Sequence, residues 1–210
     1  MSATNRSAVR RADDFYRTPA WVVRALLESE PLHGPTLEPA CGDGAILREL
    51  VERHYEPLIG VELDPDRCRA AQAQEDAARA GRVFCGDYLQ PDRQLQQTLG
   101  AWRFATVVSN PPYRQAAEFI RASLKRVQPG GRVCMLLRLN FLGSSRKRLD
   151  VVGPGSGLAR VIVLARRPSF TGGGTDACEY AWMIWIRGYT QEAHVSISVS
   201  YTHLTLPTKR

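Results

Sequence analysis

The segment SNPPY, residues 109–113, directly follows a short apolar run at residues 104–108. Two consecutive prolines cannot donate to a sheet ladder and cannot continue a helix, so a strand that reaches them must end. Asn110 and Tyr113 are therefore expected at the tip of a strand, where the prolines between them hold the backbone rigid. The sequence predicts a stiff platform that presents one carboxamide and one aromatic ring.

Two acidic residues accompany a glycine-rich turn. In LEPACGDG, Glu38 precedes the turn and Asp43 lies within it. Gly42 and Gly44 allow the backbone to bend tightly and to approach a ligand closely, and the helix that follows offers unpaired N–H groups. The two acids place negative charge where the pyrophosphate of a dinucleotide would sit. The turn therefore favours a ligand with an amino group and a sulfonium cation.

Two further acids follow later apolar runs. Glu62 in GVELDP is placed to accept hydrogen bonds from both hydroxyls of a ribose, as the acid after the second strand of nucleotide-binding folds does. Asp87 in CGDYL is suited to accept a hydrogen bond from an exocyclic adenine amine, with Tyr88 packed beside the ring. Acids after three successive strands form a more specific pattern than any one of them, although each alone is a common turn residue.

Strand and helix patterns alternate along most of the chain. Helices are expected at residues 20–28, 46–51, 64–80 and 116–127, with Thr18 as the first N-cap and Pro19 in the first turn. Strands are expected at residues 35–39, 58–63, 82–85, 104–109, 132–139, 158–165 and 179–186. This alternation predicts one α/β domain, a doubly wound, mostly parallel seven-stranded sheet with helices on both faces. Ligands of such sheets bind beyond the carboxyl ends of the strands, where the clusters above fall.

Charge and hydropathy limit the classes of function. The 210 residues are 44% hydrophobic and carry a net charge of +7, which suits one globular domain with a polyanionic partner. Basic residues cluster at residues 6–17, 138–148 and 160–167. No apolar run is long enough to span a bilayer, and the N-terminus lacks the apolar stretch of a secretion signal. We therefore expect a cytoplasmic protein.

The cysteines lie far apart, form no CxxC pair and have no histidine at ligand spacing; they are Cys41, Cys68, Cys85, Cys134 and Cys178. This pattern indicates neither a zinc site nor a disulfide framework. We expect no metal, and reduced thiols that are mostly buried.

The C-terminal segment differs in style from the rest of the chain. Residues 199–208, VSYTHLTLPT, contain no acidic residue and resemble the translation of a transposon adapter used in shotgun DNA sequencing. We expect the functional domain to span residues 1–192 and residues 193–210 to be a non-native tail. The alternative is a short threonine-rich strand and tail.

Together, the three acidic segments resemble those of class I S-adenosylmethionine-dependent methyltransferases. SNPPY narrows the resemblance to amino methyltransferases of the DNA adenine-N6 type, and the stretch from RLNFLGSS to GTDACEYAWMIW is similar to small phage and prophage members. The resemblance covers residues 15–186 and implies a Rossmann-like methyltransferase fold with S-adenosylmethionine as cofactor. The cofactor contacts that it implies are Tyr16, Thr18, Pro19, Glu38, Ala40, Gly42, Gly44, Glu62, Asp87 and Tyr88.

The same resemblance implies how the platform works. The side-chain oxygen of Asn110 and the carbonyl of Pro111 would each accept one hydrogen of the adenine amine and aim its lone pair at the cofactor's methyl group. Pro112 would keep the acceptors rigid, and Tyr113 would stack on a base flipped out of DNA. Transfer would be direct and in line, through positioning and electrostatic preorganisation.

Four further residues are expected to contact the substrate. Phe170, or Phe141 in its place, would supply the second ring against the flipped base, and Arg146 and Lys147 would contact phosphates. The alternatives are core or loop-anchoring rings and a solvated helix start. The glycine-rich residues 171–175 are expected to form a mobile loop that closes over the substrate.

The platform alone leaves the substrate open. Protein glutamine-N5 methyltransferases and some RNA guanine-N2 methyltransferases use it on planar amides or amines, and an inactive nucleic-acid-binding relic of the fold is a third alternative. The FYRTP segment and the basic loops favour nucleic acid, and the intact Asn110 argues against a relic. Methylation of adenine N6 in DNA is the predicted activity.

Overall fold

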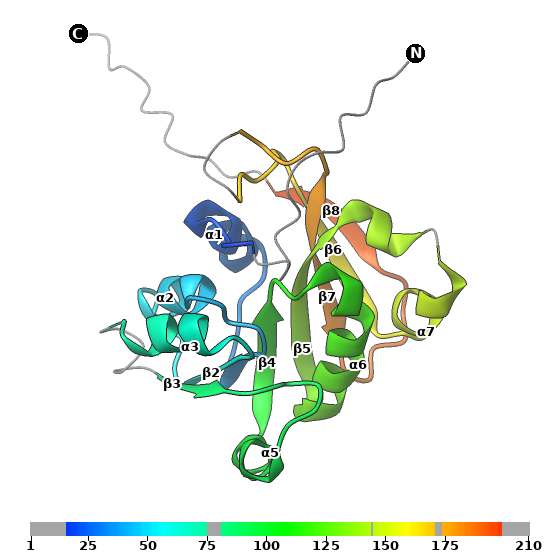
Figure 1. The fold of residues 1–210 in the computed structure, drawn as a ribbon. Helices are drawn as coiled ribbons and strands as arrows, with labels where there is room; N and C mark the ends of the chain where they lie inside the picture. Colours follow the sequence, from blue (N-terminus) through cyan, green and yellow to red (C-terminus); the bar gives the residue numbers. More distant parts are fainter. Residues whose placement is uncertain (1–15, 75–80, 144, 171–173, 199–210) are drawn as a thin grey trace, which may run out of the picture.

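A mostly parallel sheet of eight strands organises the protein in a computed structural model that describes residues 16–74, 81–143, 145–170 and 174–198 (Figure 1). The strands are β1 (Thr36–Glu38), β2 (Leu58–Glu62), β3 (Gly81–Cys85), β4 (Phe104–Ser109), β5 (Val127–Arg138), β6 (Leu158–Leu164), β7 (Tyr180–Ile186) and β8 (His194–Ser198). The α-helices are α1 (Ala20–Ser29), α2 (Ala45–Val51), α3 (Pro65–Gln72), α5 (Arg93–Gly100), α6 (Ala116–Arg126) and α7 (Leu149–Val152). The short 3-10 turns are η1 (Tyr113–Gln115), η2 (Leu139–Leu142) and η3 (Arg146–Arg148).

The strand order β3-β2-β1-β4-β5-β7-β6-β8 confirms the α/β class and corrects the strand count. The first five strands are parallel, as the crossovers require, whereas β7 runs antiparallel to both β5 and β6. The predicted number of seven strands is wrong, because β8 pairs in parallel with the outer side of β6. This edge strand exposes Val195 and Ile197, at 62% and 66%.

Strand β8 lies inside the segment expected to be a non-native tail. Residues 194–198 form this strand, and residues 199–210 lie outside the described residues. The origin of residues 193–210 stays a prediction, as does the boundary of the domain at residue 192.

Two apolar layers hold the helices against the sheet. Helices α1, α2 and α3 lie on one face, and α5, α6 and α7 lie on the other (Figure 1). Strand β7 contributes one fully buried tryptophan to each layer. The Trp182 indole donates to the carbonyl of Val22 at 2.8 Å, and the Trp185 indole donates to that of Val151 at 2.6 Å. Both buried N–H groups are thus satisfied, which fixes the sheet between its helices.

Several element ends differ from the sequence-based boundaries. Helix α1 begins with Pro19 as the N-cap residue and has no side-chain cap, so the predicted capping role of Thr18 is wrong. Helix α3 begins as expected, with the Asp64 side chain accepting from two backbone N–H groups and Pro65 at its first position. It ends at Gln72, before residue 80, and residues 75–80 lie outside the described residues.

Helix α5 was not expected from the sequence. The Asp92 side chain caps it by accepting from the Leu95 N–H at 2.8 Å, and Leu95 and Leu99 are buried one turn apart. This N-cap signal and this spacing are both readable in the sequence. Among the described residues no helix is long and apolar enough to cross a membrane, and no cluster of three metal-ligating side chains occurs.

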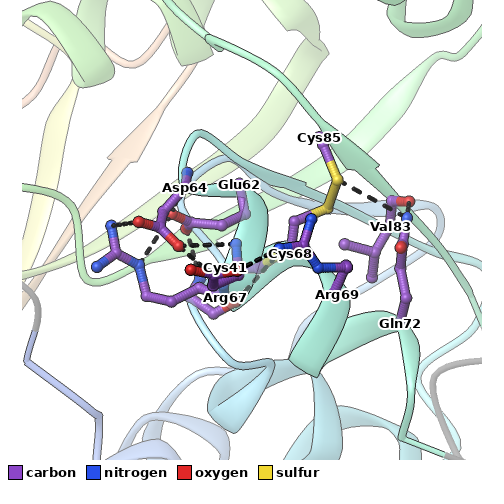
Figure 2. The surroundings of a disulfide bond; sticks show 11 residues. Cys41, Glu62, Asp64, Arg67, Cys68, Arg69, Gln72, Val83 and Cys85 are labelled. Carbon is purple, nitrogen blue, oxygen red and sulfur yellow. Dashed lines mark hydrogen bonds and ion pairs between the residues drawn. A yellow bond between two sulfur atoms is a disulfide. The ribbon is translucent and has the colours of Figure 1, made fainter.

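A disulfide joins Cys68 of α3 to Cys85 at the end of β3, with the two Cα atoms 5.6 Å apart (Figure 2). The expectation of reduced thiols is therefore wrong for this pair. No spacing pattern in the sequence indicates the pair, because it arises only when α3 packs back on β3. The remaining cysteines are free: Cys41 and Cys134 are buried, and Cys178 is partly buried.

Candidate functional site

A cleft of about 770 Å³ opens beyond the carboxyl ends of β1 to β4, as expected for this type of sheet. The predicted site residues that line it are Tyr16, Thr18, Glu38, Ala40, Gly42, Glu62, Asp87, Tyr88, Asn110, Pro112 and Tyr113. Segments from the N-terminus to the middle of the chain thus meet in one cavity. It has an acidic half beside β1, β2 and β3, and an aromatic half beside β4.

The glycine turn after β1 shapes the acidic half. Gly42 and Gly44 both have positive φ, 56° and 83°, so the turn needs residues without a Cβ. The Gly42 N–H donates to Glu62 Oε2 at 2.8 Å. Gly44 is the N-cap residue of α2, and a Cβ there would lie 3.3 Å from the Gln74 amide. Gly42 therefore faces the cleft, while Gly44 serves the packing of α2.

Glu62 links the ends of β1 and β2. It is 6% exposed, and its Oε1 accepts from the Asp64 N–H at 2.9 Å and from Arg67 Nε at 3.2 Å (Figure 2). With Gly42 on Oε2, both carboxylate oxygens are oriented by the protein. Glu62 is thus a preorganised acceptor at the edge of the cleft, and its contact with a ribose stays a prediction.

Glu38 is the unusual acid of the cleft. It is 1% exposed, and its Oε2 has no hydrogen-bond partner among the described residues. Burial raises the pKa of Glu38 well above its ordinary value, and the nearby charges of Glu62 and Asp43 raise it further. Asp43 itself pairs with Arg17 at 2.9 Å. A buried carboxyl group with an unused oxygen favours a cationic ligand, which would relieve both desolvation and repulsion.

The turn after β3 is held by contacts within the protein, and the adenine contact of Asp87 stays a prediction. Asp87 Oδ1 accepts from the backbone N–H groups of Leu89 and Gln90, at 2.8 and 3.1 Å. Tyr88 is 3% exposed; its hydroxyl lies 3.1 Å from Ser123 Oγ and its ring stacks on Phe119. The Tyr88 ring thus belongs mainly to the core, although the residue borders the cleft.

Sequence reasoning missed an apolar rim residue, Leu63, which lines the cleft and is 66% exposed. Its signal was readable, because an apolar residue stands directly after the strand-ending Glu62. An exposed leucine beside a ribose-type acceptor offers a surface on which an aromatic ring can pack.

Asn110, at the tip of β4, is held by the N-terminal segment. Its Nδ2 donates to the carbonyl of Tyr16 and to Thr18 Oγ1, each at 3.1 Å. A backbone carbonyl only accepts, so the nitrogen of the carboxamide must face Tyr16. Both amide hydrogens are used, and a ligand in the cleft therefore meets only the side-chain oxygen. Pro111, the next residue, is buried at the strand end.

Four rings form a closed cluster beside this amide. Tyr113 stacks on Tyr16, with centroids 5.8 Å apart, and also contacts Tyr180. Phe170 contacts Tyr16 and Tyr180, at 5.5 and 5.2 Å, and does not itself line the cleft. Burial raises the pKa of Tyr113, whose hydroxyl has no partner among the described residues. Tyr16 thus stacks on the ring that was expected to stack on a base, and Tyr113 still borders the cleft.

Arg138 is a second residue that sequence reasoning missed. The last residue of β5, it lines the cleft with its guanidinium carbon 5.0 Å from the centre of the Tyr113 ring. Its Nε donates to the Tyr180 hydroxyl at 3.1 Å, and that hydroxyl donates to Asp176 at 2.8 Å. Only the antiparallel pairing of β5 with β7 brings Arg138 opposite Tyr180. The aromatic half of the cleft therefore holds a guanidinium group, which is also paired with Asp176 at 3.9 Å.

The sequence matches no protein-family model and no curated protein. Solved structures with a similar fold include a candidate class I S-adenosylmethionine-dependent methyltransferase from Listeria monocytogenes, with a TM-score of 0.64 and 14% identity over 88% of this chain and 64% of that one. The M protein of type I restriction enzyme EcoKI has a TM-score of 0.64 and 16% identity, over 89% of this chain and 49% of that one. A candidate RNA methyltransferase from Pyrococcus horikoshii has a TM-score of 0.61 and 14% identity, over 82% of this chain and 84% of that one. The chain has the class I methyltransferase fold. It spans less than two-thirds of the length of the first two of these proteins.

Seven predicted site residues do not line the cleft: Gly44, Pro111 and Phe170, described above, and Pro19, Phe141, Arg146 and Lys147. Phe141 is 5% exposed in the core, with the Arg148 guanidinium 4.6 Å from its ring centre. Arg146 and Lys147 are exposed on η3. Pro19 serves as the N-cap residue of α1. Residues 171–173 of the predicted closing loop lie outside the described residues.

Proposed function

We propose that the protein is an S-adenosylmethionine-dependent methyltransferase whose acceptor is the exocyclic N6 amine of adenine in DNA. The class I methyltransferase fold supports the general chemistry, and the two halves of the cleft support the assignment of a cofactor side and a substrate side. The orientation of the Asn110 carboxamide is the observation that carries the choice of an amine as acceptor.

The acidic half fits S-adenosylmethionine. The cofactor has an ammonium group, a sulfonium centre, a ribose diol and an adenine ring, and it supplies an electrophilic methyl group. Glu38 and Asp43 offer negative charge to the cationic groups, Glu62 offers acceptors to the diol, and Leu63 offers an apolar surface to the ring. Asp87 would accept from the adenine amine.

The Asn110 amide fits an amine acceptor. Because both of its hydrogens are held by Tyr16 and Thr18, the side chain presents an oxygen to the substrate. That oxygen and the Pro111 carbonyl would each accept one N–H of a planar amine, which is a poor nucleophile while its lone pair is delocalised. Holding both hydrogens turns the lone pair toward the methyl group. Bound S-adenosylmethionine would supply the methyl group from its sulfonium centre, and the methylated nitrogen would then lose one proton to solvent.

The charge of the protein supports a polyanionic substrate. The net charge is +7, and Arg114 and Arg138 border the aromatic half of the cleft. A base in duplex DNA must leave the stack to reach this cleft, and contacts with aromatic rings offset part of that cost. Among the proteins of similar fold, one is a restriction-enzyme M protein and another a candidate RNA methyltransferase. Both classes of nucleic acid therefore belong in the test.

The test measures transfer of a labelled methyl group to adenine-containing duplex DNA, to RNA of the same sequence and to a protein with an accessible glutamine. We expect label on DNA, at adenine N6. Asn110→Ala should lower the rate roughly a hundred- to a thousandfold, as removal of one preorganised polar contact typically does. The exposed Asn140→Ala is the matched control and should retain activity. Label on protein alone, or full activity without Asn110, would refute the assignment.

A further inference from the structure

The Cys68–Cys85 disulfide joins a buried sulfur to an exposed residue. Cys68 is fully buried on the inner side of α3, whereas Cys85, the last residue of β3, is exposed. Figure 2 shows the bridge between the helix and the strand end, with Gln72 and Val83 beside it. The exposure of Cys85 brings the bridge within reach of small thiols, and such access distinguishes exchangeable disulfides from inert ones.

Both ends of the bridge adjoin the acidic half of the cleft. Cys68 directly follows Arg67, whose Nε holds Glu62 Oε1 at 3.2 Å. Cys85 directly precedes Gly86, whose N–H donates to the Glu62 carbonyl at 2.8 Å, and Asp87 follows. Arg67, Gly86 and Asp87 all line the cleft. The disulfide therefore connects the segment that contains Arg67 to the segment that contains Gly86, and both of these residues bond to Glu62.

Strand β3 depends on this cross-link more than the inner strands do. It is the edge strand and pairs with β2 only. A polar contact with α3, the bond from Gln72 Nε2 to the Val83 carbonyl at 2.9 Å, lies in an exposed position where water competes for it. The bridge closes a loop with a sequence separation of 17, and such a closure restricts the chain substantially.

We propose that Cys68 and Cys85 form a thiol-exchange site that sets the affinity of the acidic half for its cofactor. This coupling rests on the proposed function for the identity of the ligand. A small thiolate attacks Cys85 Sγ, the S–S bond breaks, and Cys68 leaves as a thiolate that takes up a proton. A second thiolate attacks the mixed disulfide on Cys85, releases the small-molecule disulfide and leaves a second protein thiol. The oxidised form holds Gly86 and Asp87 against the Glu62 turn, and the reduced form releases them.

The test compares oxidised and reduced protein, prepared with glutathione disulfide and with reduced glutathione. Calorimetry with S-adenosylhomocysteine should give a Kd about tenfold larger for the reduced form. By reciprocity the ligand should make the disulfide about tenfold harder to reduce, a shift of about 30 mV for a two-electron couple. Thiol alkylation and mass spectrometry measure that equilibrium, and thermal melting should show a lower midpoint for the reduced form.

Cys85→Ser should bind the ligand like reduced wild-type protein in both buffers. Cys178→Ser removes a partly buried cysteine that is free in the structure, and it should retain the full redox response. Equal affinity of the two redox forms, or failure of glutathione disulfide to join Cys68 to Cys85, would overturn the inference while leaving the proposed function intact. Absence of binding by both forms would refute the proposed function and this coupling with it.

Discussion

The two halves of the cleft differ in charge and in how they are built. The acidic half consists of turns that follow β1, β2 and β3, and its acids are oriented mostly by neighbours on the same or the adjacent turn. The aromatic half gathers Asn110, Tyr113 and Arg138 with partners from remote segments. Under the proposed function, the first half would bind a cation and the second a planar amine beside an anion.

This difference separates binding from chemistry. Because the acidic half would hold the cofactor before any acceptor enters, changes there should act first on cofactor affinity. Changes in the aromatic half should lower turnover without changing the affinity for the cofactor. The reason is that Asn110 offers only its side-chain oxygen to the cleft, where the acceptor would bind. Single substitutions in each half test whether cofactor affinity and turnover change separately.

The largest effect is expected for Glu62→Ala. It removes a buried carboxylate that organises Gly42, Asp64 and Arg67 as well as the predicted diol contacts. Hydrogen bonds to a charged group contribute roughly 1.5–3 kcal/mol each, so loss of two should weaken S-adenosylhomocysteine binding by a factor of roughly 10² to 10⁴. Calorimetry measures this. Glu49→Ala is the matched control, because Glu49 is also a buried acid paired with an arginine, Arg24, and does not line the cleft. Wild-type affinity in the Glu62 variant would contradict the assignment of the acidic half.

A smaller effect is expected for Thr18→Val, which tests the aromatic half. The substitution keeps the shape and removes the acceptor for Asn110 Nδ2, so the amide loses one of its two anchors. One hydrogen bond is worth about 1 kcal/mol, and kcat should fall roughly five- to tenfold with unchanged affinity for S-adenosylhomocysteine. Thr18→Ser restores the hydroxyl and should restore kcat. If affinity falls instead and kcat holds, Thr18 acts on the cofactor, as the sequence resemblance implied.

The same division explains what sequence could predict. The turns at Gly42, Glu62 and Asp87 are local, so their residue types and spacing identify them in the sequence alone. The contact from Asn110 to Tyr16 spans 94 positions, and that from Arg138 to Tyr180 spans 42. Neither leaves a short-range pattern. The Cys68–Cys85 pair has the same origin, because only packing of α3 on β3 brings the sulfur atoms together.

Tertiary packing also decided which rings and cations reach the cleft. Phe141 follows β5, and Phe170 lies in the loop before β7. Phe141 packs in the core beside the Arg148 guanidinium, whereas Phe170 contacts Tyr16. Arg146 stands in the most basic run of the chain and is exposed, whereas Arg138, eight positions earlier in the sequence, lines the cleft. Residue type alone does not distinguish the two phenylalanines or the two arginines.

The smallest effect is expected for Glu38→Gln, which should change the number of protons released on cofactor binding. Burial raises the pKa of Glu38 in the folded protein, so the folded state holds this proton more tightly than the unfolded state. Stability from this group is therefore present at low pH and falls as pH rises from about 4.5 toward the raised pKa. A bound cation favours the ionised carboxylate, so cofactor binding should release a proton and tighten as pH rises through the same window.

Calorimetry of S-adenosylmethionine binding in two buffers of different ionisation enthalpy counts the released protons. Wild-type protein should release protons on binding in the pH range between the ordinary and the raised pKa of Glu38, and Glu38→Gln should release fewer and show a flatter dependence of affinity on pH. The variant should also lose the decline of melting temperature with rising pH, because its amide does not titrate. Equal proton release by both proteins would mean that the unpartnered oxygen of Glu38 does not meet the cation. The acidic half would then bind its ligand through Glu62 and the glycine turn alone.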